Sequence, residues 1–253
     1  MRNLLKQSKV QLILTLLPIL LLSLLNGYPI SQTVNPAVII FSAVFFDLLF
    51  LSLRRVKLFF PSAAIATGII LSLIIDPFAP FYVLIAAPFA AIFSKNFIRM
   101  GRHIFNPAAF GALTIAILFS SQASWWGPSI YLGSPLYLLV FLPGLVSFYR
   151  MRRWRIISAF LLSYLILGTI FNLQFSIYNL FDPTLIFFSL VMLPEPMTTP
   201  NHPKRQILFG AFVALITFVL PQLFQVSNLQ FSMNIDPLIL SLLLGNLLFF
   251  KFR

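Results

Sequence analysis

The chain contains 253 residues, of which 60% are hydrophobic, 9% are charged and 30 are phenylalanine. A water-soluble globule of this size cannot cover its surface with so few polar side chains, so the composition predicts a protein embedded in lipid. The formal net charge is +12, but the bases stand in short clusters between long apolar runs rather than in a stripe with interleaved aromatic residues, which argues against nucleic-acid binding.

Ten apolar segments follow one another along the chain, and each is predicted to form a membrane helix. Their approximate ranges are 10–25, 34–53, 58–75, 81–94, 104–119, 136–149, 156–171, 180–193, 207–224 and 237–250. A complete crossing takes about 20 residues, and several of these segments are shorter. We therefore expect the short segments to extend into their flanks or to be broken or half-length helices.

The positions of lysine and arginine predict the direction of each span, because these residues collect in the cytoplasmic loops of membrane proteins. All 17 of them fall at the chain ends or in alternate loops. The clusters lie within 2–9, 54–57, 95–102, 150–155, 204–205 and 251–253. The sequence therefore predicts an all-α, multi-pass protein of the cytoplasmic (inner) membrane, with about ten transmembrane helices and with its N- and C-termini in the cytoplasm.

The two halves of the chain share a faint repeat, in which an acid–proline pair follows the third helix and an Asx–proline pair precedes the fifth. The pairs are Asp76-Pro77, Asn106-Pro107, Glu195-Pro196 and Asp236-Pro237. Five spans per unit make the second copy inverted relative to the first, as in many transport proteins. The pattern predicts a single membrane domain, 1–253, with repeats at about 10–119 and 136–250. Each pair alone is also an ordinary helix cap.

Four segments, in the same order, resemble the membrane subunits RnfD and NqrB. Residues 101–111, GRHIFNPAAFG, are similar to the F-N-P-A segment of that family, and residues 62–76 are similar to its third helix. Residues 194–200, PEPMTTP, are similar to its D-P-V-T-S-P segment, and Asn246 stands where its last helix carries an asparagine. The ten-helix inverted repeat of the family agrees with the topology predicted above.

The resemblance implies a subunit of an electron-transport complex that passes electrons via flavin and couples them to Na⁺ or H⁺ translocation. The chain has no cysteine, so it lacks the usual iron–sulfur ligands, and a redox role requires a bound organic cofactor. The expected partners are other membrane subunits and the iron–sulfur or flavoprotein subunits of such a complex. His103 and His202 stand apart from any carboxylate-rich cluster, and no metal site is predicted.

One departure from the family concerns covalent flavin attachment. Members carry a flavin phosphate on the threonine of an S-G-A-T motif beyond the fifth helix, but the corresponding loop here reads SSQASWWGPSIYLGSP. Ser134 takes the place of that threonine, yet a serine before a proline at a helix start is more often an N-cap. We instead expect FMN or riboflavin to be bound non-covalently, with Arg102, Asn106, Thr198 and Thr199 as lining residues. The alternative makes Arg102 a topology anchor and the threonines helix caps.

Two further features of the sequence invite a functional interpretation. Asp47 lies inside the second apolar segment, where a charged side chain is costly, and it is the candidate for ion or proton binding. The alternative is a carboxylate paired with Arg54, two helical turns further along the same face. Trp125, Trp126 and Tyr131 are predicted to be aromatic-belt anchors at the outer interface, with flavin stacking or carrier docking as the alternative.

Two other functions remain open from the sequence. An inverted repeat with few charges also suits a transporter or channel for a small solute or ion. A third interpretation makes the chain a non-catalytic membrane anchor that docks a flavoprotein. Bound flavin favours electron transport, whereas solute flux without a redox partner favours transport.

Overall fold

The computed structural model describes residues 7–27, 34–129, 135–171, 175–227 and 234–252. Within them the chain is mostly helical, and its strands are the two short arms of one hairpin, β1 (Arg99–Met100) and β2 (Arg102–His103). Long apolar runs form helices in lipid because a helix satisfies its backbone hydrogen bonds within one segment. The all-α fold predicted from the sequence is confirmed.

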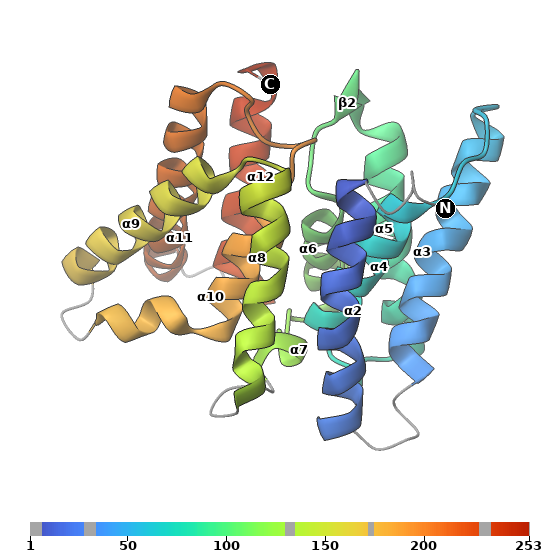
Figure 1. The fold of residues 1–253 in the computed structure, drawn as a ribbon, viewed down its shortest axis with the longest axis horizontal. Coiled ribbons are helices and arrows are strands. Elements are labelled where there is room, and N and C mark those ends of the chain that lie inside the picture. Colours follow the sequence, from blue (N-terminus) through green and yellow to red (C-terminus); the bar gives the residue numbers. More distant parts are fainter. Residues whose placement is uncertain (1–6, 28–33, 130–134, 172–174, 228–233, 253) are drawn as a thin grey trace.

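The first half of the chain occupies the centre and right of Figure 1. Its helices are α2 (Ser8–Gly27), α3 (Val34–Leu53), α4 (Ser62–Ile74), α5 (Phe81–Phe97), α6 (Pro107–Phe119) and the short α7 (Trp126–Ser129). Helix α3 packs against α4 and α5, and α6 packs against α5. Helix α2 packs on α4 and faces the second half of the chain.

The second half lies on the left of Figure 1 and is more broken. Its elements are η2 (Pro135–Phe141), α8 (Leu142–Leu145), η3 (Val146–Arg150), α9 (Trp154–Phe171), η4 (Ile177–Phe181), α10 (Pro183–Phe187), η5 (Phe188–Met192), α11 (Pro203–Ser227), α12 (Pro237–Phe249) and η7 (Phe250–Phe252). The turns η3 and η5 are π-helical, and η2, η4 and η7 are 3₁₀-helical. Helix α11 packs along α9 and beside α12.

Four helices are long and apolar enough to cross a bilayer, judged by length and composition. They are Ser8–Leu25, Val34–Leu53, Trp154–Phe171 and Pro203–Phe224. Six shorter apolar helices bring the number within the described ranges to ten. The predicted multi-pass membrane character is thereby confirmed, and the six shorter helices have 10–17 residues.

The two halves meet along α2 and α8 and along α6 and α12. One core runs through both halves, and its fully buried side chains include Leu16, Ile69, Phe160 and Phe188. Glycine permits a close approach between α9 and α11, because a Cβ atom at Gly210 would lie 2.5 Å from the Ile156 carbonyl oxygen. A larger side chain there would push these two helices apart.

The basic clusters of the sequence lie at one end of the molecule, which is called the basic end below. The top of Figure 1 carries the end of α3, the β1–β2 hairpin, the starts of α9 and α11, and η7. These segments, together with the end of η3 just before α9, hold the described lysines and arginines beyond Lys9 and Lys95. The arrangement agrees with the alternation of basic and non-basic loops along the chain.

The loop after α6 folds into the protein instead of lying at its surface. Trp125 and Trp126 are only 4% and 6% exposed. Their indole N–H groups donate to the Asp236 carboxylate at 2.6 Å and to the Ser72 carbonyl at 2.7 Å. The prediction that these two residues are aromatic-belt anchors is therefore wrong, since indoles bonded inside the protein do not face lipid headgroups. Tyr131 lies outside the described residues.

Candidate ligand cavity at the basic end

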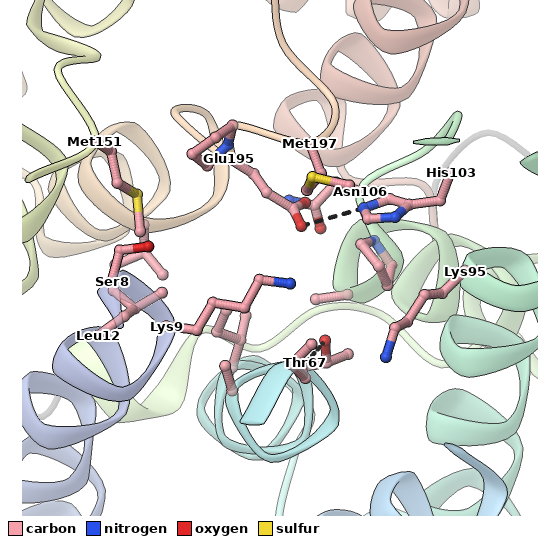
Figure 2. Close-up of a pocket in the computed structure, with 17 residues that line it drawn as sticks. Ser8, Lys9, Leu12, Thr67, Lys95, His103, Asn106, Met151, Glu195 and Met197 are labelled. Carbon is pink, nitrogen blue, oxygen red and sulfur yellow. Dashed lines mark hydrogen bonds and ion pairs between the residues drawn. The ribbon is translucent and has the colours of Figure 1, made fainter. Parts of the chain in front are cut away.

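A cavity of about 180 Å³ lies toward the basic end, where α2, α4, α5, α6 and the loop after η5 come together. Figure 2 shows the side chains around it. Its polar wall includes Lys9, Lys95, His103, Asn106 and Glu195. Much of the remaining wall is apolar, including Leu12, Ile70, Met151, Val191 and Met197. An apolar pocket with a few convergent polar groups is the usual form of a small-molecule site.

The cavity has basic side chains on facing walls. Lys9 comes from the first turn of α2 and Lys95 from the last turn of α5, and the Lys9 nitrogen points toward the middle of the cavity (Figure 2). His103 Nε2 lies 3.4 Å from Glu195 Oε1. The Lys95 ammonium is paired with the Asp47 carboxylate behind the wall, so the Lys9 ammonium, which points into the cavity, is the charge that favours an anionic ligand there.

Asn106 caps α6 and joins it to the second half of the chain. Its side-chain oxygen accepts a hydrogen bond from the Ala109 N–H, and a proline follows it in the first turn. Its side-chain nitrogen donates to the Met192 carbonyl at 3.0 Å, and its backbone N–H donates to Asn246 Oδ1 at 2.8 Å. Asn246 in turn donates to the Thr198 carbonyl. These hydrogen bonds hold α6, η5 and α12 together beside the cavity.

Asp47 is completely buried in α3. Its basic partner is Lys95, whose Nζ lies 2.8 Å from Asp47 Oδ1. Asn96 Nδ2 lies 3.4 Å from the same oxygen, and Arg54 donates to Asn96 at 3.0 Å. The predicted alternative of an Asp47–Arg54 pair is therefore wrong in its partner, because the packing of α5 on α3 brings an ammonium group closer. Asp47 Oδ2 accepts no hydrogen bond within the described part of the chain.

Arg153 holds the loop after η5, which forms one wall of the cavity. Its buried guanidinium donates to the Pro196 and Pro200 carbonyls, and to Asn201 Oδ1 at 2.7 Å. Burial lowers the pKa of Arg153, and the nearby charge of Arg102 lowers it further. An arginine stays protonated in proteins, so its charge adds to the positive potential of the basic end.

The residues predicted to line a flavin site lie in different places. Asn106 is part of the cavity wall. Thr198 and Thr199 are fully buried, and the Thr199 hydroxyl donates to the Glu195 carbonyl at 2.7 Å. Arg102 is exposed on β2 and is not part of the cavity wall.

Sequence reasoning did not single out Lys9, Lys95 or His103 as neighbours of one cavity. The distribution of bases along the chain explains both lysines as topology signals, and nothing local shows that both reach one cavity. One available signal is the repeat, because its Asn106-Pro107 and Glu195-Pro196 pairs both reach the cavity wall.

Ser134 lies outside the described residues, so its role as an N-cap rather than a flavin attachment site stays a prediction.

A second buried carboxylate lies away from the cavity, at the start of α12. Asp236 caps that helix by accepting hydrogen bonds from the N–H groups of Leu238 and Ile239, and it also accepts one from Trp125. Burial raises the pKa of Asp236, although these three hydrogen bonds lower it. The carboxylate ties the loop after α6 to the second half of the chain.

The ten apolar helices and the cavity between them define a polytopic membrane protein with an internal cavity. The family model described as "NQR2, RnfD, RnfE family" matches residues 1–135 and 129–249. The chain therefore belongs to this family. The resemblance to the RnfD and NqrB membrane subunits is confirmed.

Three similar proteins are each named as a subunit of an ion-translocating oxidoreductase complex. The one from Ectopseudomonas mendocina is 32% identical over 127 residues, which are 48% of this chain and 36% of that protein. The one from Escherichia coli is 33% identical over 88 residues, 34% of this chain and 23% of that protein. The one from Actinobacillus succinogenes is 32% identical over 83 residues, 31% of this chain and 23% of that protein. The matched stretches thus span well under half the length of these relatives.

Proposed function

We propose that this chain is the membrane subunit of an electron-transport complex and that its cavity holds FMN or riboflavin non-covalently. The observation that carries the proposal is the cavity, in which apolar walls and the inward-pointing Lys9 ammonium meet beside the helix start capped by Asn106. A flavin joins a planar ring system to a polar chain, and the wall offers a partner for each part. Membership of the NQR2, RnfD, RnfE family supports the same class of function.

The size of the cavity limits which part of a flavin it encloses. A cavity of about 150 Å³ holds one benzene ring, so a cavity of about 180 Å³ encloses only a part of a flavin. The rest of the ligand must extend beyond the enclosed volume. A bound flavin would supply the capacity to accept and release electrons, which the side chains of this cysteine-free chain lack.

The wall residues have separate tasks in this proposal. Leu12, Ile70 and Val191 contact the ring system and exclude water from it. Lys9 binds the anionic part of the ligand, because its ammonium nitrogen points into the cavity. His103 Nε2 and Glu195 Oε1, 3.4 Å apart, form a polar part of the wall beside the ligand.

The partners and the membrane orientation belong to the same proposal. Electrons must reach and leave the chain, so we expect iron–sulfur or flavoprotein subunits beside it and coupling to Na⁺ or H⁺ movement. The name that the three relatives carry supports this expectation.

The basic end would face the cytoplasm of the inner membrane, with the two halves as inverted repeats. Labelling of Lys204→Cys from the cytoplasm and Gln122→Cys from outside tests the orientation, and the reverse pattern would overturn it.

The test for the cofactor is to purify the full chain in mild detergent and measure flavin absorbance before and after denaturation. We expect yellow colour that separates from the polypeptide. Lys9→Gln should weaken flavin binding about tenfold, since a hydrogen bond to a charged group is worth about 1.5 kcal/mol or more. Lys57→Gln is the matched control, because Lys57 is an exposed lysine that does not line the cavity.

Two outcomes would replace this proposal. Solute flux in proteoliposomes, from a chain that carries no flavin under any condition, would make it a transporter or channel. A chain that carries neither flavin nor solute but binds a flavoprotein would be a membrane anchor. Flavin that stays on a peptide containing Ser134 after denaturation would show covalent attachment and contradict the non-covalent site.

A further inference from the structure

We infer that the binding of a phosphate-bearing anion in the cavity is coupled to the uptake of one proton by Asp47, because Lys95 cannot serve both anions at once. This inference rests on the proposed ligand cavity, but it does not require the ligand to be a flavin or to change its redox state. The ligand chemistry is a phosphate group, whether of FMN, of free phosphate or of a lipid headgroup.

Lys95 lies between Asp47 and the cavity. Its Nζ lies 2.8 Å from Asp47 Oδ1, and the same side chain forms part of the cavity wall. The Lys95 side chain is 15% exposed, whereas that of Asp47 is completely buried. A lysine ammonium group on its four-carbon stem can move between two partners a few ångströms apart. An anion in the cavity therefore competes with Asp47 for Lys95.

The other charged groups nearby do not replace Lys95 beside Asp47. Lys9 on α2 and Glu195 in the loop after η5 line the cavity with Lys95. The positive charge of Lys9 repels the Lys95 ammonium group, and the negative charge of Glu195 attracts it. His103 faces Glu195 across the cavity wall. Arg54, at the end of the helix that carries Asp47, donates to Asn96. Within the described residues, Lys95 is the basic group that forms an ion pair with Asp47.

Asp47 must respond when Lys95 turns to an anion in the cavity. A buried carboxylate that loses its cation is strongly destabilised, and such a group neutralises by taking up a proton. Oδ2 is the atom to which the proton adds, because it accepts no hydrogen bond within the described part of the chain. The empty state holds a Lys95–Asp47 ion pair, and the filled state holds a Lys95–anion pair and a neutral Asp47. The difference is one proton taken from solution, with no electron transferred.

Proton uptake on binding determines how the affinity for the anion changes with pH. If one proton is taken up for each anion bound, the affinity for the anion falls about tenfold for each unit by which the pH rises. The second ionisation of a phosphate ester, near pH 6, acts in the opposite direction, because the dianion binds an ammonium group more tightly. Removing the Asp47 carboxyl should therefore abolish the fall and leave only the weaker dependence of the ligand itself.

The first experiment uses the unaltered full chain in nanodiscs of neutral lipid. Binding of FMN, inorganic phosphate and riboflavin is followed by calorimetry at one pH in two buffers that differ in ionisation enthalpy, which counts the protons exchanged. We expect about one proton taken up per FMN or phosphate bound, and none per riboflavin. Proton uptake of zero on FMN and phosphate binding would overturn the inference while leaving the flavin proposal intact. Failure of all three ligands to bind would overturn both.

Nanodiscs that contain phosphatidylglycerol distinguish the source of the phosphate. If a lipid headgroup is the natural occupant, FMN and inorganic phosphate should bind at least tenfold more weakly there than in neutral lipid. If the occupant is a soluble phosphate compound, their affinities should agree in the two lipids. Either result supports a phosphate site when it comes with proton uptake in neutral lipid.

Variants supply the second experiment. Asp47→Asn should bind FMN more tightly than the unaltered chain above neutral pH and lose the proton uptake, whereas Lys95→Gln should bind FMN about tenfold more weakly. Asp76→Asn, which changes an aspartate outside this cavity, is the matched control and should keep the original pH dependence. Retained pH dependence in Asp47→Asn, or dependence on Na⁺ concentration in place of pH, would contradict the inference. If Asp47→Asn does not fold, the proton count on the unaltered chain decides.

Discussion

The helix pairs α3–α5 and α9–α11 pack closely by different means. Between α3 and α5 lie the buried ion pair of Asp47 and Lys95 and a row of phenylalanine rings, such as Phe50 and Phe97, whose centroids are 5.2 Å apart. Between α9 and α11 the backbones themselves approach at Gly210. No salt bridge between described residues joins α9 to α11.

The difference shows that packing alone does not require charge in these helices. The α9–α11 pair buries Phe160 completely and needs only a missing side chain at Gly210. The α3–α5 pair holds two charged groups that apolar side chains of similar volume could replace at little or no cost in stability. The charges lie beside the cavity, so the comparison points to ligand binding as the reason for them.

The largest expected effect is on stability and comes from disrupting the α9–α11 contact. Gly210→Leu places a side chain against the Ile156 carbonyl oxygen, where even a Cβ atom would be 2.5 Å away. We expect a loss of about 3 kcal/mol or more in stability, measured as low membrane abundance and early thermal unfolding in detergent. Gly101→Ala is the control, because that site has open space and a φ of +72°, so it should cost only about 1 kcal/mol. Equal losses in the two variants would contradict the close-packing account.

The next largest effect comes from removing one partner of the Asp47–Lys95 ion pair between α3 and α5. Lys95→Met leaves Asp47 buried without its cation, which should cost about 3 kcal/mol. The double variant Asp47→Asn/Lys95→Met removes both charges and should recover most of that loss. Thermal unfolding of the two single variants and the double variant gives the coupling energy. If the losses of the two single variants simply add up in the double variant, the two side chains act independently.

A smaller effect concerns the side-chain amide hydrogen bonds that join the two halves beside the cavity. Asn246→Ala removes the acceptor of the Asn106 N–H and the donor to the Thr198 carbonyl. Two buried backbone groups would lose their partners, at a cost of about 2 kcal/mol. Flavin or phosphate affinity should fall with it, since Asn106 is part of the cavity wall. Unchanged stability and affinity would show that other groups replace these bonds.

The smallest effect concerns a buried carboxylate outside both pairs. Burial raises the pKa of Asp236, so the folded protein binds that proton more tightly than the unfolded chain does. The stability of the unaltered protein should therefore decline as the pH rises from about 3.9, the ordinary value for aspartate, through the higher folded-state pKa. Asp236→Asn keeps a good helix cap and should lack this part of the pH dependence. Thermal unfolding across that pH range compares the two proteins.

The sequence predicted the features of this fold that depend on neighbouring residues. Apolar runs showed the helices, and the Asx–proline pairs showed the caps at Asn106 and Asp236, because composition and capping act within one or two turns. The pairing of Asp47 with Lys95 could not be predicted, since the two are 48 residues apart and their contact depends on how α3 and α5 cross. The same holds for Lys9 and His103 at the cavity.

The two tryptophans show why a general preference can mislead at a particular site. Tryptophan favours membrane interfaces because it has an apolar body and one polar N–H group. The same two properties suit it to a buried position when an acceptor is available. Here Trp125 has a φ of +50°, and its loop turns inward so that its N–H reaches Asp236. That acceptor lies 111 residues away in the chain, beyond the reach of local sequence reasoning.

The π-helical turn η5 limits how this segment can change in evolution. A π-helical turn holds one residue more than an α-helical turn does, and here it presents the Leu190 carbonyl to Ser147 and the Met192 carbonyl to Asn106. Deleting one residue would restore an ordinary α-helix and rotate the chain beyond it by about 100°. Glu195 would then leave the cavity wall. Natural selection can exchange the side chains of this segment, but it is expected to reject insertions and deletions there.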